Sequence, residues 1–182
     1  KAASAPRHGG ALRCCSRSAR RASSTTRMYR CTNSPIHEAT LRADNEAVLR
    51  LVSEKASLVA KATAEGATPL HVASLNETSQ HLAESLLKLG GPVDAVDAVG
   101  FAPLHRMVQF NRVYGATALL AYGAEVNQEI QGSSDTPLHL AARANFQEMA
   151  ILLLAHGGNC NARNAAGEKP VDLGLEELWA DS

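Results

Sequence analysis

The chain has 182 residues, and its 18 Lys or Arg residues balance 18 Asp or Glu residues, so the formal net charge is zero. With only 3 Phe, 3 Tyr and 1 Trp, an aromatic cage for a ligand is not expected. No run of 18 or more apolar residues occurs, so no membrane-spanning helix is predicted. The four Cys residues include no Cys-x-x-Cys pair, which argues against a structural zinc site or a disulfide framework and is typical of a reducing intracellular compartment.

Residues 1–32 differ in composition from the rest of the chain. They contain 8 Lys or Arg residues and no acidic residue, whereas residues 33–182 contain 10 basic and 18 acidic residues, a formal charge of −8. The overall neutrality is therefore a cancellation between two unlike parts. Because Ser, Ala, Arg and Gly dominate residues 1–32 without a helical or strand period, the composition predicts an unstructured basic extension.

Three interpretations of this basic extension remain open. Arg-rich and Ser-rich segments without acidic residues are typical of organellar import signals. A mature basic extension could instead bind RNA phosphates or an acidic protein surface, because Lys and Arg gain affinity from released counterions without needing a fixed fold. The extension could also be inert. The candidate contacts to RNA or to an acidic subunit are Arg13, Arg17, Arg20, Arg21, Arg27 and Arg30.

From Asn33 onward a tetrapeptide recurs at a fixed spacing. Ser, Thr or Ala is followed by Pro, then by Leu or Ile, then by His, in four copies that start at Ser34, Thr68, Ala102 and Thr136. Each copy begins 34 residues after the last, and a degenerate copy begins at Lys169. Ser or Thr followed by Pro is a typical helix start. A period of this size indicates one supersecondary unit that is copied and stacked.

The rest of each period has the same order of features. Leu-rich segments such as 82–89 and 146–154 repeat apolar residues three and four apart, which predicts a second helix with a buried face. A Gly-rich, hairpin-like stretch follows, most clearly at 90–100. An Asn lies near each predicted junction between the two helices, where it can adopt the left-handed conformation that ends a helix. These residues are Asn45, Asn76, Asn111 and Asn145.

Together these segments closely resemble the ankyrin repeat, whose pattern combines a Thr-Pro-Leu-His helix start with a Gly-rich turn. The resemblance implies an all-α repeat fold, an ankyrin-type solenoid of stacked helix-turn-helix units with β-hairpin-like fingers. We expect four repeats over residues 33–168 and a C-terminal capping half-repeat over residues 169–182. The acidic residues of the capping half-repeat would supply the polar outer surface that a terminal repeat needs.

The conspicuous polar residues do not form a recognisable catalytic pattern. In ankyrin-like arrays the His of the tetrapeptide makes structural hydrogen bonds along the stack, which is the role expected for His37, His71, His105 and His139. Asp94 and Asp97 fall at turn positions, where an Asp side chain bonds the local backbone. No phosphate loop, nucleophile elbow or metal-ligand spacing is present in the sequence. We therefore expect no enzymatic activity, no metal, no cofactor and no small-molecule substrate.

The resemblance implies that a protein partner contacts the finger tips and the exposed side of the first helices. Aromatic and Arg side chains often anchor such interfaces. The same mapping places Val72 and Leu75 on the exposed side. The candidate partner-binding residues are Val99, Phe101, Arg106, Gln109, Phe110, Ile130 and Arg143. The alternative for the apolar ones, Val99, Phe101, Phe110 and Ile130, is that the neighbouring repeat partly covers each of them.

The leading hypothesis is a non-enzymatic interaction module or adaptor that binds a protein through its concave ankyrin surface. The alternative is an accessory subunit of a larger organellar assembly, such as a ribosome or a respiratory or membrane complex. In that case the basic extension would contact RNA or an acidic subunit. The extension favours a mitochondrion or another organelle, with the cytoplasm or the nucleus as alternative locations.

Overall fold

The structure is a computed structural model that describes residues 34–174. Four helix pairs follow one another along the described chain, and a single short helix comes after them. The first helices of the pairs and the final helix are α2 (Pro35–Leu41), α4 (Pro69–Ala73), α6 (Pro103–Gln109), α8 (Pro137–Arg143) and α10 (Pro170–Leu173). The second helices are α3 (Asn45–Glu54), α5 (Leu82–Lys88), α7 (Val113–Ala121) and α9 (Gln147–Ala155). Two short 3₁₀ helices complete the set, η2 (Ala56–Ala60) and η3 (Ser79–His81).

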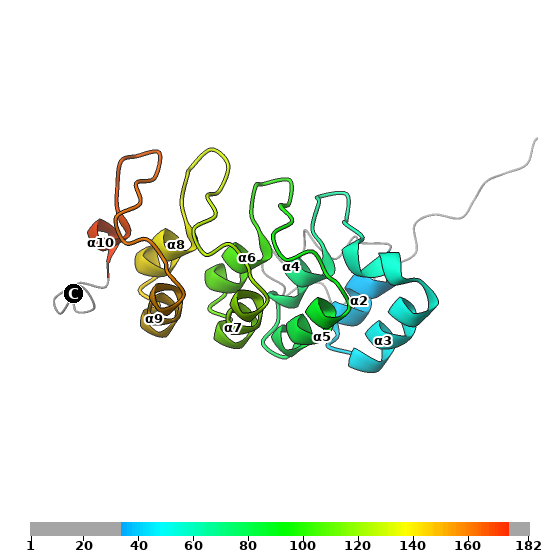
Figure 1. The fold of residues 1–182 in the computed structure, drawn as a ribbon. Coiled ribbons are helices and arrows are strands. Elements are labelled where there is room, and N and C mark those ends of the chain that lie inside the picture. The colour runs from blue at the N-terminus through cyan, green and yellow to red at the C-terminus, as the bar shows by residue number, and fades with distance from the viewer. Residues whose placement is uncertain (1–33, 175–182) are drawn as a thin grey trace, which may run out of the picture. The chain divides into compact units, whose positions relative to one another are not determined.

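The helix pairs stack side by side in one array. Each first helix contacts the first helix of the next pair, and α7 contacts both α5 and α9. The first helices form one row, the second helices form another, and the fingers all extend to the same side of the helices (Figure 1). The predicted helix starts are confirmed, because the Pro of every tetrapeptide is the first residue of a helix. The core is built mainly of Leu, Ala and Val side chains, with Met107 and Met149 also fully buried.

The imidazole of the tetrapeptide closes the start of the first helix in three repeats. In the second repeat the backbone N–H of Thr68 donates to Nδ1 of His71 over 3.1 Å. The same bond joins Ala102 to His105 over 3.2 Å, so it forms without the hydroxyl that the third repeat lacks. In the first repeat, by contrast, Nδ1 of His37 is buried without a hydrogen-bond partner. The imidazole thus satisfies an N–H group that a helix start would otherwise leave unpaired.

The junction between the two helices of a pair follows the Asn prediction in only two repeats. Asn111 and Asn145 have left-handed backbones, with φ of 53° and 56°. In the first repeat the left-handed residue is Ala43, and Asn45 instead begins α3. In the second repeat the junction is longer and contains η3. There the Asn76 side chain donates to the carbonyl oxygen of Leu41 over 2.8 Å. The prediction was therefore wrong for Asn45 and Asn76.

The fingers are tight hairpin-like turns, and no β-strand is assigned within residues 34–174. Fingers 1 to 4 span residues 62–67, 96–101, 129–135 and 163–168. In finger 1 the N–H of Thr63 donates to the carbonyl oxygen of Ala67, and in finger 2 the N–H of Asp97 donates to that of Phe101, each over 2.9 Å. Finger 4 has the same bond over 3.0 Å, and finger 3 has it across one additional residue. Neighbouring fingers also bond directly, since the N–H of Ala98 donates to the carbonyl oxygen of Glu65 over 2.9 Å.

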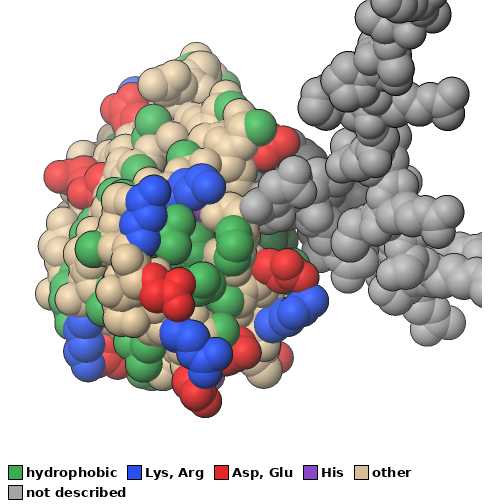
Figure 2. Space-filling view, turned by 90° about the vertical axis from the view of Figure 1, so that its right-hand side faces the viewer, with side chains coloured by type: hydrophobic (Ala, Val, Ile, Leu, Met, Phe, Trp, Pro, Cys, Tyr) green, Lys and Arg blue, Asp and Glu red, His purple; other side chains and the backbone are tan. Residues whose placement is uncertain are grey.

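The two ends of the described array differ from its middle. Figure 2 looks onto the end formed by α2 and α3 and shows apolar side chains surrounded by charged ones. Pro35 is exposed at this end, whereas Pro69, Pro103 and Pro137 are buried. Each of those three helices packs against the first helix of the preceding repeat. At the other end only α10 of the predicted capping half-repeat is described, and its residues 175–182 lie outside the described range.

Candidate functional site

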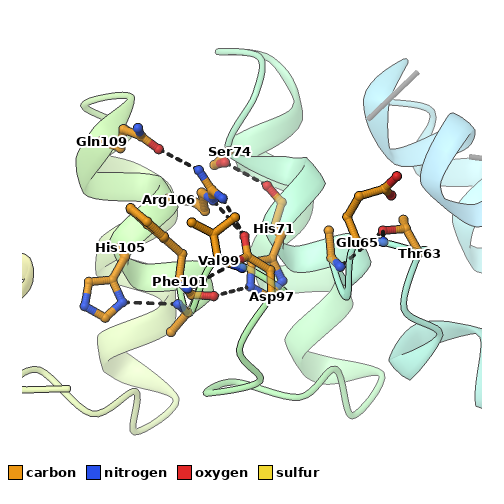
Figure 3. Close-up of polar contacts among 12 residues, drawn as sticks. Thr63, Glu65, His71, Ser74, Asp97, Val99, Phe101, His105, Arg106 and Gln109 are labelled. Atoms are coloured by element: carbon orange, nitrogen blue, oxygen red, sulfur yellow. Dashed lines mark hydrogen bonds and ion pairs between the residues drawn. The ribbon is translucent and has the colours of Figure 1, made fainter. Parts of the chain in front are cut away.

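Asp97 lies at the base of finger 2 and holds both the finger and the following helix. Its Oδ1 atom accepts the backbone N–H groups of Val99 and Phe101, each over 3.0 Å. Its Oδ2 atom accepts from the Arg106 guanidinium, over 3.0 Å from Nε and 2.5 Å from Nη2 (Figure 3). The local backbone bonds predicted for Asp97 are thus confirmed. The ion pair adds a link between finger 2 and α6.

Arg106 is fixed by three neighbours. In addition to Asp97, its Nη1 donates to Oε1 of Gln109 over 2.9 Å. Its guanidinium carbon lies 4.2 Å from the centroid of the Phe101 ring, a distance at which a cation is attracted to the ring face. The residue is only 5% exposed. The expectation that Arg106 projects into solvent was therefore wrong, because finger 2 folds back onto α6 and places a carboxylate beside the guanidinium.

The electrostatics of this cluster favour the charged pair. Burial alone would raise the pKa of Asp97, but the bonds from Arg106, Phe101 and Val99 outweigh it and hold the pKa below its usual value. The negative charge of Asp97 and the positive charge of Arg106 largely cancel, so the pair adds little net charge to the nearby surface. Hydrogen bonds to charged groups are among the strongest in proteins, so this pair rigidly positions the Phe101 ring.

Four imidazoles connect the repeats along the array. The Nε2 atom of His71 lies 2.9 Å from the carbonyl oxygen of Phe101, and that of His105 lies 2.9 Å from the carbonyl oxygen of Gln128. His37 and His139 make the equivalent contacts to Ala67 and Glu168. The structural role predicted for these His residues is confirmed. Because Nδ1 of His71 and of His105 accepts a backbone N–H, each donates from Nε2 and is neutral.

Burial keeps two of these imidazoles neutral. Desolvation lowers the pKa of His105 to about 4, and it also lowers the pKa of His71. The bonds from Nε2 to carbonyl oxygens act in the opposite direction and are weaker. A buried neutral imidazole with both nitrogens engaged is a structural group, since it has no free nitrogen to accept a proton from a substrate.

Four of the seven candidate residues lie together. Val99, Phe101, Arg106 and Gln109 form one cluster on finger 2 and α6 (Figure 3). Val99 is 52% exposed, Gln109 is exposed and Phe101 is half-buried. These three side chains are therefore the accessible part of the cluster.

The remaining candidates lie elsewhere. The Phe110 side chain is half-buried at the end of α6. Arg143 lies on α8, keeps 48% of its side chain exposed and forms ion pairs with Asp135 at 3.1 Å and Glu168 at 3.7 Å. Of the two alternatives for Ile130, burial is the one that the structure shows, because Ile130 is 5% exposed at the base of finger 3. The additional residue of that finger shifts its tip onto Gln131 and Gly132.

Val72 and Leu75 also differ from expectation. Both were placed on the exposed side of the first helices, yet they are 1% and 8% exposed.

The Arg residues proposed for the basic extension, from Arg13 to Arg30, lie outside the described residues. Sequence reasoning missed the pairing of Asp97 with Arg106, and the only available signal was the presence of an acid and a base nine residues apart.

Two kinds of feature are absent from residues 34–174. No group of three or more His, Cys, Asp or Glu side chains in that range is arranged to hold a metal ion. Likewise, none of the helices described there is both long and apolar enough to cross a bilayer.

Comparison with known proteins agrees with this geometry. The family model of ankyrin repeats in three copies matches residues 36–130 and again residues 80–164. The chain belongs to the ankyrin-repeat family. Ankyrin repeats are protein–protein interaction modules, and the described array is such a module.

Among ankyrin-repeat relatives, human Rabankyrin-5 is 29% identical over 160 residues, which cover 79% of this chain and 14% of the relative. The human SMC5-SMC6 complex localization factor protein 1 is 33% identical over 127 residues, 66% of this chain and 12% of the relative. The mouse ankyrin repeat and SOCS box protein 9 is 35% identical over 109 residues, 60% of this chain and 37% of the relative. The chain thus spans well under half the length of each of these relatives, and the likeness concerns the repeats.

Proposed function

We propose that this chain is a non-enzymatic adaptor that binds a protein partner through finger 2 and the adjoining exposed side of α6 and α8. The observation that carries the proposal is Val99, which is 52% exposed on a finger whose backbone is fixed by Asp97. An apolar side chain on a rigid support loses little conformational entropy when it binds. The neighbouring Phe101 ring, held against Arg106, supplies an aromatic contact of the kind that dominates interface energies.

The test is capture of partners from a cell extract by the full-length chain, with variants at Val99 and Gln109. Val99→Ser combined with Gln109→Ala should lose the captured protein, because both side chains are exposed on the proposed surface. Val99→Ser alone is the second variant, since Gln109→Ala also removes the bond that Gln109 accepts from Arg106. Ile151→Ser is the matched control, since Ile151 is 53% exposed but lies on the second helix α9. Capture that is unchanged in the double variant, or equally reduced by the control, would contradict the proposal.

A second function is supported by the charge of residues 1–32, which carry 8 basic residues and no acidic one. In this proposal the chain is an accessory subunit of an organellar assembly, such as one in a mitochondrion, and the basic extension contacts RNA or an acidic subunit. Such contacts weaken steeply as the salt concentration rises, because the counterions that binding releases then gain less free energy.

The two functions are separated by removing residues 1–32. Under the adaptor proposal the shortened chain retains its partner, and raising the salt concentration has a small effect. Under the assembly proposal the shortened chain fails to enter the complex, and the full chain dissociates from it between about 50 and 200 mM salt. Co-sedimentation of the full and shortened chains with isolated organelle complexes measures this difference.

A further inference from the structure

Finger 2 differs from the other three fingers in the charge of its tip. Its exposed side chains are Val96, Ala98 and Val99, of which the two Val residues are 43% and 52% exposed. The one carboxylate of this finger, Asp97, is buried. The other described fingers each carry a glutamate, at Glu65, Glu129 and Glu168. Finger 4 also carries the exposed Arg163, so the row as a whole is charged and finger 2 is the one described finger without an accessible charged side chain.

The buried ion pair keeps this surface neutral. The Arg106 side chain is 7% exposed and its partner Asp97 carboxylate is 2% exposed, so neither charge is offered to a partner. An acidic peptide would gain little from Arg106, because the guanidinium is already bonded to Asp97 and Gln109. The contact that finger 2 offers is thus apolar, through Val99 and the Phe101 ring.

The neighbouring finger 1 carries a half-buried carboxylate, that of Glu65. Glu65 and Val99 occupy the same position in their turns, each two residues after the side chain that holds the turn, Thr63 or Asp97. The two fingers are joined there by the bond from the N–H of Ala98 to the carbonyl oxygen of Glu65. No ion pair of the Glu65 side chain is present within residues 34–174. Glu65 and Val99 are drawn in Figure 3.

We infer that the joined tips of fingers 1 and 2 bind a partner segment that carries an apolar side chain and, a few residues away, a Lys or Arg. The apolar side chain contacts Val99 and Phe101, and the basic side chain pairs with Glu65. This inference rests on the proposed adaptor function and specifies its partner. Complementary charge at the edge of an apolar contact selects among partners more than it adds affinity, because an exposed ion pair contributes about 0.2–1 kcal/mol.

The test is selection of a displayed library of random 12-residue peptides on the full-length chain, followed by sequencing. The wild-type chain should enrich peptides that carry Lys or Arg within a few residues of an apolar residue. Glu65→Lys should reverse the preference, so that Asp or Glu replaces Lys or Arg near the apolar residue. Glu148→Lys is the matched control, since Glu148 is exposed in the first turn of α9, away from the fingers, and should leave the selected peptides unchanged.

The outcomes distinguish this inference from the function on which it rests. The inference is overturned if Glu65→Lys selects the same charges as the wild-type chain, or if the wild-type chain enriches no peptide. If Val99→Ser abolishes the selection while Glu65→Lys leaves the charges unchanged, the binding surface stands and the pairing with Glu65 is wrong. If Val99→Ser leaves the selection unchanged, the surface itself is wrong. Circular dichroism melting curves confirm that each variant is folded.

Discussion

Asp97 both holds the turn of finger 2 through backbone bonds and forms an ion pair with Arg106 of α6. At the corresponding positions Thr63 and Asn164 also use one side-chain oxygen to accept two backbone N–H groups of their turns. Asp97 alone among these three adds a carboxylate oxygen that pairs with a buried guanidinium. A buried charge that loses its partner is strongly destabilising, whereas a half-exposed pair contributes little.

This difference predicts unequal costs for the same substitution in two fingers. Asp97→Asn should keep the turn, as Asn164 does, but should lower the free energy of unfolding by about 3–5 kcal/mol because Arg106 stays buried without its counterion. Asp135→Asn should cost less, about 1 kcal/mol, since its partner Arg143 is 48% exposed and the remaining amide oxygen can still accept the bond from Asn164. Urea denaturation measures both values. Adding Arg106→Met to Asp97→Asn should recover part of the loss, and equal costs for the two Asn variants would refute this account.

Among the elements, the helix starts were predictable from sequence and the contacts between elements were not. Ser or Thr followed by Pro fixes a helix start through local geometry, so the 34-residue spacing located every first helix. The burial of Arg106 depends on a finger that folds back across nine residues, and the burial of Ile130 depends on one inserted residue. Neither has a local signal. The accessible candidates Val99 and Gln109 were predictable because their exposure follows from the repeat frame.

The packing of α6 against α7 shows a further contact without a sequence signal. Gly115 lies in the interior of α7, and a Cβ atom added there would lie 2.5 Å from Sδ of Met107 on α6. Met107 is fully buried, so the flexible end of its side chain would have to shift against its packed neighbours to make room. A glycine inside a helix normally weakens it, so close packing explains its presence here.

Gly115→Ala should therefore destabilise the array by about 1–3 kcal/mol, although Ala is the better helix former. Met107→Ala should also destabilise it, through the cavity that it leaves. The double variant should cost less than the two single costs combined, because the new methyl group fills part of that cavity. Thermal or urea unfolding of the four proteins measures the coupling, and strictly additive costs would show that the two residues do not pack as described.

At the scale of the whole described array, the buried imidazoles connect stability to pH. His105 has its pKa lowered to about 4, while the unfolded chain takes up a proton near pH 6.5. Between these values the unfolded state binds more protons than the folded state, so stability falls as the pH falls. The lowered pKa values of His37 and His71 act in the same direction. The lowered pKa of Asp97 and Asp135 makes their contribution disappear only at more acidic pH, below about 4.

The free energy of unfolding should thus be constant above about pH 7 and should decrease from pH 6.5 to pH 4. His105 alone accounts for about 3 kcal/mol of that decrease, since one pKa unit corresponds to about 1.4 kcal/mol. Urea denaturation at half-unit pH intervals follows the change. His105→Gln should show a shallower decrease over the same interval, and identical slopes for the two proteins would disprove the assignment.

The shared turn geometry of Thr63, Asp97 and Asn164 has an evolutionary consequence. Each makes the same two backbone bonds with one oxygen, so the path of the finger does not depend on which of them is present. The rest of the side chain is free to be a methyl group, an anionic oxygen or an amide donor. Where no buried guanidinium depends on the second oxygen, as one does on Asp97, exchanges among these three residue types can alter the charge beneath a finger while the backbone is inherited unchanged.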